Sequence, residues 1–188
     1  MAPSALLLAP GAGADRTSPA LVAIDEALTA LGWTVARMDF PYRLAGRRAP
    51  DRPPVLLAAV REAAAELVER AGIAPERLVL GGRSMGGRIC SMAVADGLPA
   101  AGLILVSFPL HPPGRPEKQV ERTRHFPELR VPCLFVSGTK DAFGTPAELE
   151  AATGAIPGPV THVRIDGGDH GLRTRNVQVA REIAGWTG

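Results

Sequence analysis

Short apolar runs alternate along the chain with longer stretches in which apolar and polar positions follow a helical period. The apolar runs occupy Ala5–Ala9 and residues 34–39, 77–80, 102–107, 133–137 and 161–165. Several of them are continuously apolar, which is typical of strands covered on both faces. The pattern therefore predicts about six strands in the interior of a layered fold.

Helical periodicity marks the segments between these runs. Residues 19–31 carry apolar side chains three and four positions apart, with Ser18 as the expected N-cap. Residues 54–71 begin at a proline and end before Gly72, as helices commonly do. The other predicted helices are residues 84–96, Pro146–Thr153 and residues 174–186. This alternation predicts an α/β fold, with a mostly parallel sheet, right-handed crossovers and helices on both faces.

Two long loops rich in proline and arginine, residues 40–54 and 108–116, follow the carboxyl ends of predicted strands. Ligands of open parallel sheets bind at that edge, so we expect both loops to flank a site. No repeat, low-complexity tract or linker divides the sequence. We therefore expect one domain over residues 1–188.

Composition narrows the class of protein. Apolar residues make up 46% of the chain and charged residues 21%, which is typical of globular proteins. No segment approaches the about eighteen apolar residues that a membrane helix needs, and the apolar start is too short for a signal peptide. We expect a cytoplasmic location without membrane contact. Cys90 and Cys133 lie in apolar runs, so buried, reduced thiols are expected, with no disulfide framework and no metal site.

The charge pattern argues against nucleic acid as a partner. The net charge is only +2, although arginines cluster within residues 43–52 and 115–130. Aromatic residues amount to 4% of the chain, which leaves little for stacking on bases. We interpret the arginines as a solvated surface and expect no nucleic-acid partner.

Residues 81–88 carry the strongest chemical signal. They contain Gly82-x-Ser84-x-Gly86 between a predicted strand and a predicted helix. This is the arrangement of a nucleophile elbow, in which a strained turn projects the serine above the sheet. Glycine-rich strand-to-helix turns also occur without this chemistry. The segment lacks the Lys-Ser/Thr pair that a phosphate-binding loop requires.

An acid and a base follow later strands. Asp141 comes after the fifth predicted strand, and His170 lies in a glycine-rich loop after the last one. A carboxylate there can orient an imidazole, which can then take a proton from Ser84. The chain order Ser, Asp, His is that of α/β-hydrolases. Asp166 and Asp169 are alternative acids, but their closeness to His170 in sequence ranks them lower.

The remaining histidines are interpreted mainly as surface or packing residues. His125 lies in no predicted element, and His162 lies inside the last predicted strand. His111 lies in the second long loop and could line a substrate pocket.

The loop after the first strand offers backbone amides for an oxyanion hole. Met85, directly after the expected nucleophile, supplies one amide, and we choose Ala12 for the other, with Gly11 or Gly13 as alternatives. Each such donor stabilises a tetrahedral intermediate by roughly 3 kcal/mol. The loop also begins like a dinucleotide-binding fingerprint, but Arg16 stands in place of its third glycine.

These motifs resemble the α/β-hydrolase superfamily, and within it a dienelactone-hydrolase-like group of small proteins without a lid. Relatives in the nearest family include a subunit of a chromatin-modifying complex. The resemblance rests on residues 8–13, 40–42, 46–48, 81–88, 108–114, 141–144 and 169–170. It implies a minimal sheet without the usual first two strands or a cap domain, and a triad of Ser84, Asp141 and His170. Where the group has His-Gly before the oxyanion loop, this chain has Pro10-Gly11.

The sequence thus predicts a serine hydrolase for a small acyl substrate, of carboxylesterase or thioesterase type, without a cofactor. Arg43, Arg83 and Arg115 are candidates for pairing with an anionic substrate, beside the pocket candidate His111. A non-catalytic binding or scaffold protein on the same fold is the alternative. Acyl transfer to an acceptor other than water shares the mechanism, and the oligomeric state stays open.

Overall fold

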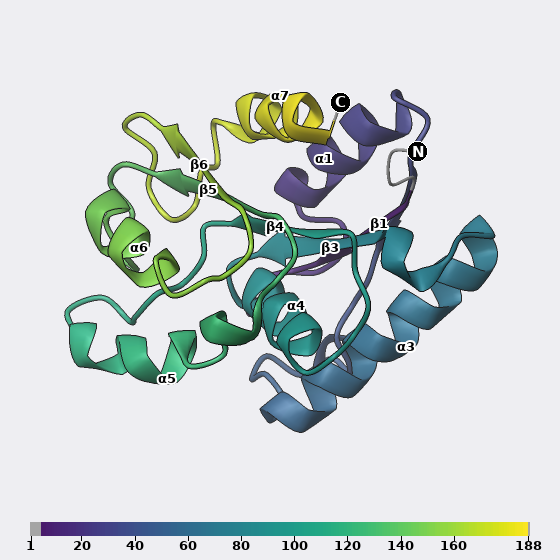
Figure 1. Cartoon of the computed structure of the whole chain (residues 1–188), viewed down its shortest axis with the longest axis horizontal. Coiled ribbons are helices and arrows are strands. Elements are labelled where there is room, and N and C mark those ends of the chain that lie inside the picture. Colours follow the sequence, from purple (N-terminus) through teal and green to yellow (C-terminus); the bar gives the residue numbers. More distant parts are fainter. Residues whose placement is uncertain (1–4, 188) are drawn as a thin grey trace.

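Six parallel strands form one sheet in the computed structural model, which describes residues 5–187 (Figure 1). Their order is β2-β1-β3-β4-β5-β6, and all five pairings are parallel. The predicted α/β fold is therefore confirmed. Residues 1–4 and 188 of the expected domain lie outside the described residues. The strands are β1 (Ala5–Ala9), β2 (Thr34–Arg37), β3 (Leu78–Arg83), β4 (Gly102–Val106), β5 (Cys133–Gly138) and β6 (Val160–Ile165).

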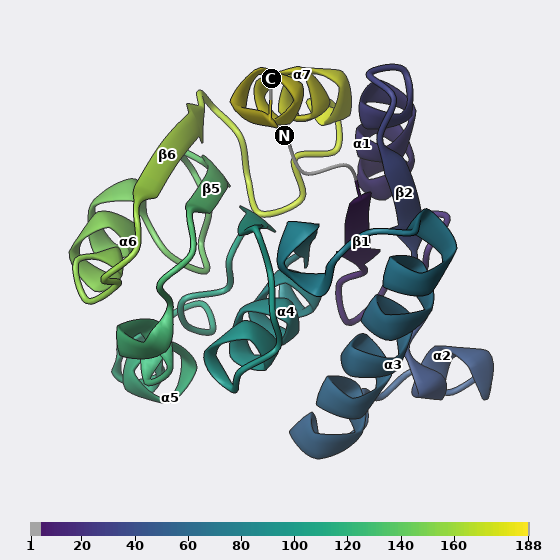
Figure 2. The same ribbon diagram turned by 45° about the vertical axis from the view of Figure 1, so that its right-hand side comes forward.

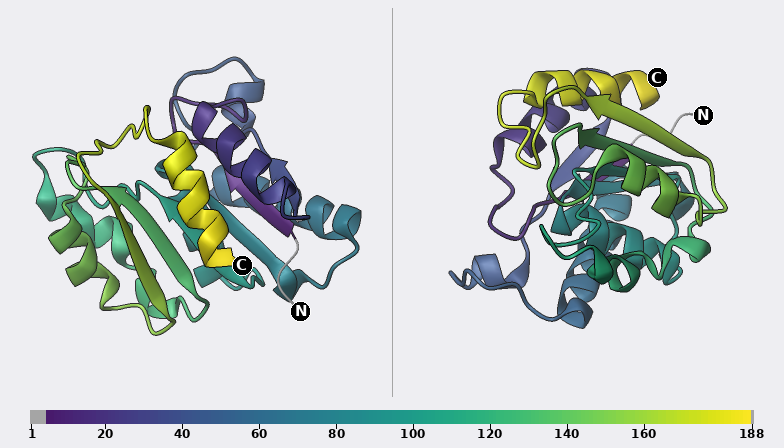
Figure 3. Two further views of the ribbon diagram at one scale, coloured as in Figure 1. Left: turned by 90° about the horizontal axis from the view of Figure 1, so that it is seen from above. Right: turned by 90° about the vertical axis from the view of Figure 1, so that its left-hand side faces the viewer.

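Helices connect the strands and cover both faces of the sheet. They are α1 (Pro19–Thr29), α2 (Pro41–Leu44), α3 (Pro53–Ala71), α4 (Met85–Ala95), α5 (Gln119–Thr123), α6 (Pro146–Thr153) and α7 (Asn176–Thr187). Helices α1 and α7 lie side by side over one face, while α3 and α4 cover the other (Figures 1 and 3). Helix α6 lies next to β6, and α5 lies below it on the same side of the molecule (Figures 1 and 2).

The two faces of the sheet bury two separate apolar clusters. Along β4, Leu103 and Leu105 point to the α3–α4 side, while Ile104 and Val106 point to the α1–α7 side. This alternation is the period of a strand, and burial on both sides explains why the run is continuously apolar. The sheet is thus held from both faces, which fixes the position of its carboxyl edge.

Strand β3 is longer than predicted, and its extra length brings it to the site. The prediction ended it at Leu80, because Gly81 and Gly82 resemble a turn. Both glycines instead continue the strand and pair with Ile104 and Leu105 of β4. A Cβ at Gly81 would lie 2.6 Å from the Ile104 carbonyl oxygen, so this pairing leaves no room for a side chain there. Strand β2 differs in the opposite sense and ends at Arg37, two residues before the prediction.

The helix boundaries also differ in detail. Two short helices were not predicted: α2 lies in the first long loop, and α5 follows the second. Helix α3 ends where expected, at Ala71, and Gly72 follows in the left-handed region with φ 62°. Ser18 does occupy the N-cap of α1, but its side chain makes no capping hydrogen bond. Pro19 at the first helical position already lacks an N–H, so less of that end needs capping.

Both cysteines are free and buried, as predicted. Burial raises the pKa of each thiol to about 12, so neither is a thiolate near neutral pH. Among the described residues, no helix has the length and apolar character to cross a membrane.

Candidate active site

Ser84 occupies a sharp turn between β3 and α4. Its backbone has φ 52° and ψ −120°, and its amide donates to the Val106 carbonyl at 2.9 Å. Glycine is required on both sides, because a Cβ on Gly82 or Gly86 would collide with the Ala9 carbonyl oxygen. The turn therefore has the backbone geometry expected of a nucleophile elbow, and the packing of β1 against it holds this geometry in place.

Asp141 and His170 lie in the loops after β5 and β6. These loops touch, since the Lys140 amide donates to the Gly168 carbonyl at 2.8 Å. A Cβ on Gly138 would collide with that same carbonyl, so only glycine allows the approach. The glycine-rich loop thus brings the histidine back over the sheet toward the end of β3.

The three side chains form a continuous hydrogen-bonded line. His170 Nδ1 lies 3.0 and 2.9 Å from the two carboxylate oxygens of Asp141, and His170 Nε2 lies 2.9 Å from Ser84 Oγ. An ionised carboxylate only accepts, so Nδ1 carries the hydrogen and Nε2 is the acceptor. The Ser84 hydroxyl therefore donates to His170, which is the direction that general-base activation of a serine requires.

Neighbouring groups hold the acid and the base. The Asp141 side chain is 1% exposed, and its Oδ1 also accepts from the Phe143 amide at 2.8 Å. The Phe143 ring stacks on His170 with 4.0 Å between ring centroids. Arg83 Nη2 donates to the His170 carbonyl at 2.8 Å. Burial, and next Arg173, lower the pKa of Arg83, yet a guanidinium stays charged near neutral pH.

The alternative acids are engaged elsewhere. Asp166 accepts from the Thr139 hydroxyl at 3.3 Å, and Asp169 accepts from the Leu172 amide at 2.9 Å. Both contacts stabilise the turn that carries His170, while Asp141 alone of the three is bonded to the ring.

The predicted oxyanion residues lie beside Ser84. Met85 is the first residue of α4, where a backbone amide has no acceptor within its own helix. Ala12 lines the same pocket as Ser84 and Met85, and its carbonyl accepts from the Tyr42 hydroxyl at 2.8 Å. This bond ties the loop after β1 to α2, so the Ala12 backbone is held in place. Tyr42 was not predicted to take part.

A pocket of about 330 Å³ opens at Ser84. Loops after β1, β2, β4 and β5, together with α3, α4 and α5, contribute to it. Its lining residues are Ala12, Pro50, Asp51, Pro53, Leu56, Ser84, Met85, Arg88, Ile89, Pro109, Arg122 and Phe143. Both proline-rich loops reach it, as the sequence predicted.

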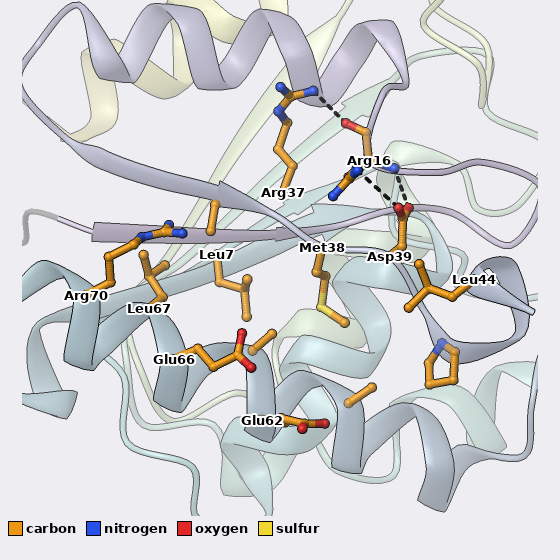
Figure 4. Close-up of a pocket in the computed structure, with 14 residues that line it drawn as sticks. Leu7, Arg16, Arg37, Met38, Asp39, Leu44, Glu62, Glu66, Leu67 and Arg70 are labelled. Carbon is orange, nitrogen blue, oxygen red and sulfur yellow. Dashed lines mark hydrogen bonds and ion pairs between the residues drawn. The ribbon is translucent and has the colours of Figure 1, made fainter.

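A larger hollow of about 470 Å³ lies away from Ser84, between β2 and α3 (Figure 4). Charged side chains of both signs line it, among them Arg16 and Asp39, whose side chains lie 3.4 Å apart. Its lining contains no nucleophile paired with a base. The smaller pocket is therefore the candidate site.

Most of the predicted substrate-binding residues interact with other groups of the protein. Arg43 lies 3.6 Å from Asp15, and Arg115 forms an exposed pair with Glu117 at 3.1 Å. Arg83 holds the His170 carbonyl. None of these arginines is among the residues that line the 330 Å³ pocket.

His111 is buried close to the site without lining that pocket. Its Nδ1 donates to the Pro112 carbonyl at 2.9 Å, and its Nε2 is 3.7 Å from Glu148. Its backbone amide donates to the Phe143 carbonyl at 3.0 Å. His111 therefore braces the loop that carries Phe143.

The other two histidines pack, as expected. His125 Nε2 lies 2.8 Å from Ser91 Oγ, and His162 Nε2 lies 3.0 Å from Thr153 Oγ1. Burial, then Arg88 and Arg124, lower the pKa of His125 to about 4. It is therefore uncharged at neutral pH.

Sequence reasoning missed Arg88 and Arg122, which do line the pocket. Arg88 stands four residues after Ser84 on α4, and that spacing puts both on one helix face. This spacing was a usable signal. Arg122 offered none, because the helix that carries it was not predicted.

The chain belongs to the family described as an alpha/beta hydrolase domain, whose model matches residues 2–183. Among solved structures it is similar to an alpha-beta serine hydrolase homologue from Coxiella burnetii, with 18% identity and a TM-score of 0.80 over 98% of this chain and 85% of the other. A dienelactone hydrolase from Anabaena variabilis has 20% identity and a TM-score of 0.77 over 98% and 85%. The esterase domain of a Rhodothermus marinus protein has 18% identity and a TM-score of 0.74 over 100% and 89%.

At these identities the structures establish the shared fold. None of the curated proteins compared with the chain matches it significantly. The predicted dienelactone-hydrolase-like fold is confirmed, and kinship with a chromatin-complex subunit stays a prediction.

Proposed function

We propose that the protein is a serine hydrolase that cleaves esters or thioesters of a small acyl group. The observation that carries this proposal is the line of hydrogen bonds from Ser84 Oγ through His170 to buried Asp141, with separations of 2.9 to 3.0 Å. A serine without such a base is a poor nucleophile at neutral pH. The esterase and serine hydrolase names among the structural neighbours agree with it.

In the proposed reaction, Ser84 Oγ attacks the substrate carbonyl while His170 Nε2 takes its proton. Asp141 stabilises the resulting imidazolium, and the Met85 and Ala12 amides donate to the oxyanion. His170 then gives the proton to the leaving group, which leaves an acyl group on Ser84. Water, activated by His170, releases the acid and restores the hydroxyl.

The residues themselves supply every group this cycle needs, so we propose no cofactor. A small-molecule substrate is the expected partner. The cytoplasmic location and the lack of a nucleic-acid partner stay predictions from the sequence.

Labelling with a fluorophosphonate probe tests the proposal. We expect wild type to be labelled and to hydrolyse short p-nitrophenyl esters. Ser84→Ala should lose labelling and at least about 10⁴-fold in kcat, because nucleophile, base and acid act as a unit. Ser107→Ala is a matched control, since Ser107 also has a positive φ and follows the neighbouring strand β4.

Two outcomes would contradict the proposal. Folded wild type that resists the probe would favour the non-catalytic scaffold on this fold. Labelling that survives in Ser84→Ala would assign the reactivity to another residue.

A further inference from the structure

Two arginines from different elements line the Ser84 pocket. Arg88 extends from α4, one helical turn after Ser84, and Arg122 extends from α5. Both side chains are partly buried. The pocket that opens at the proposed nucleophile is therefore lined by two positively charged residues.

Neither guanidinium is neutralised by the protein. Within residues 5–187, no carboxylate oxygen lies within 4.0 Å of Arg88 or Arg122. Arg88 Nε is buried without a hydrogen-bond partner, and Arg122 Nη1 donates only to the Pro109 carbonyl, at 2.9 Å. Arg37, in contrast, pairs with Asp25 at 2.7 Å. Because buried charges are normally paired, these two guanidinium groups have unused capacity for an anion.

Two acids lie near these guanidinium groups, and Glu121 offsets a part of their charge. Asp51 lines the pocket; its Oδ1 accepts from Arg47 at 2.8 Å, and its Oδ2 is buried without a hydrogen-bond partner. Glu121 is exposed and pairs with Lys118 at 2.9 Å.

The surrounding groups are otherwise positive or neutral. Arg124, an exposed residue near Arg88 and Arg122, adds further positive charge. Burial, and then Arg122 and Arg124, lower the pKa of Arg88, while Glu121 raises it by less. Burial first, and then the charges of Arg88 and Arg124, keep His125 uncharged at neutral pH.

We propose that Arg88 and Arg122 form a subsite for a carboxylate on the acyl part of the substrate, so that the preferred substrate is a half-ester or half-thioester of a short dicarboxylic acid. This inference rests on the proposed function and names its substrate class. A planar guanidinium binds a carboxylate through paired N–H donors, which neutral acyl chains cannot use. A volume of about 330 Å³ suits a short acyl chain.

Hydrolysis of matched ester pairs tests the subsite. Each pair consists of the monoethyl ester of succinate, glutarate or adipate and the same ester with the free carboxylate replaced by a primary amide. Wild type should favour at least one acid over its amide by about tenfold or more in kcat/KM. Arg88→Met and Arg122→Met should each reduce that ratio about tenfold or more, with Arg88→Lys in between. Arg124→Met, which removes a neighbouring charge outside the pocket, should keep the ratio.

Two further measurements separate this proposal from the general one. Wild type that is labelled by fluorophosphonate but shows no preference for the acids remains a serine hydrolase and overturns the subsite. Calorimetric titration with glutarate needs no turnover and therefore tests the subsite even in protein that does not react. Binding that Arg88→Met weakens about tenfold supports it, whereas no binding, together with no preference, overturns it. Circular dichroism checks that each variant is folded.

Discussion

Backbone strain in this molecule gathers where the loops leave the sheet. Among the described residues, positive φ at non-glycine positions occurs at Ser84, Ser107 and Leu172. They follow β3, β4 and β6, on the edge where His170 meets the proposed nucleophile. Each such residue costs roughly 1–3 kcal/mol, so the rest of the fold must hold it in place. Strain confined to this edge agrees with a functional site there.

Single residues also determine how stability responds to acid. The partly buried His125 has a pKa of about 4 when folded, against 6.5 as the ordinary value. As pH falls from 6.5 toward 4, the His125 imidazole binds a proton in the unfolded chain but stays unprotonated in the folded chain. His125 therefore makes the folded state lose stability in that window, by up to roughly 3 kcal/mol once pH is below 4.

We predict that His125→Gln flattens this dependence. Glutamine can keep a hydrogen bond with Ser91 but does not titrate. The free energy of unfolding from urea titrations, measured at pH 7, 5.5 and 4, should fall less steeply for the variant than for wild type. Parallel curves for the two proteins would show that His125 is not the group that titrates.

At the scale of elements, the junction of β3 and α4 tolerates no added atom. A Cβ on Gly86 would lie 2.6 Å from the Pro10 carbonyl oxygen and would collide with that of Ala9. These are backbone atoms and cannot swing aside. Gly185, in contrast, lies exposed on α7, and a Cβ there meets nothing within 4 Å.

The two glycines form a matched pair for a test. Gly86→Ala should destabilise the fold by about 3 kcal/mol or more, because β1 must shift away from α4. Gly185→Ala should stabilise it by up to about 1 kcal/mol through helix propensity. Thermal unfolding should then show opposite shifts, at about 2–4 °C per kcal/mol for a domain of this size. An unchanged melting temperature in Gly86→Ala would mean that the junction of β3 and α4 can make room for the added Cβ atom.

The strands and main helices were predictable because burial on both faces leaves a direct mark on sequence. The predicted end of β3 was wrong at Gly81 and Gly82, because glycine suits both a turn and a tightly packed strand. Only the neighbouring strand decides, since Ile104 leaves no room for a side chain at Gly81. Helix α2 was missed because it is four residues long and has no period to detect.

The line of Ser84, Asp141 and His170 was predictable because each follows a strand, and parallel strands end at one edge. The charged residues around it were not. Arg83 and Arg115 looked available in sequence, but their partners, the His170 carbonyl and Glu117, depend on how loops fold back. Whether an arginine is free to bind a substrate depends on whether another part of the fold supplies it with a partner, and local sequence does not show this.

At the scale of the whole molecule, one sheet separates two apolar clusters. The α3–α4 side contains Leu105, and the α1–α7 side contains Trp33 with Trp186 packed against it. Both tryptophans of the chain therefore report on the same side. Since the clusters share every central strand, loosening one should loosen the other.

Leu105→Ala tests this coupling. Leu105 is fully buried on the α3–α4 side, so its truncation should cost about 2–5 kcal/mol and lower the melting temperature by about 5–15 °C. If the domain unfolds as one unit, tryptophan fluorescence from the opposite side must shift by the same amount as far-ultraviolet circular dichroism. Ile104→Ala, its neighbour facing the tryptophans, should show the same coincidence. A fluorescence transition that stays at the wild-type temperature in Leu105→Ala would mean that the two faces unfold separately. In that case the carboxyl edge, and the site on it, would depend on only one of them.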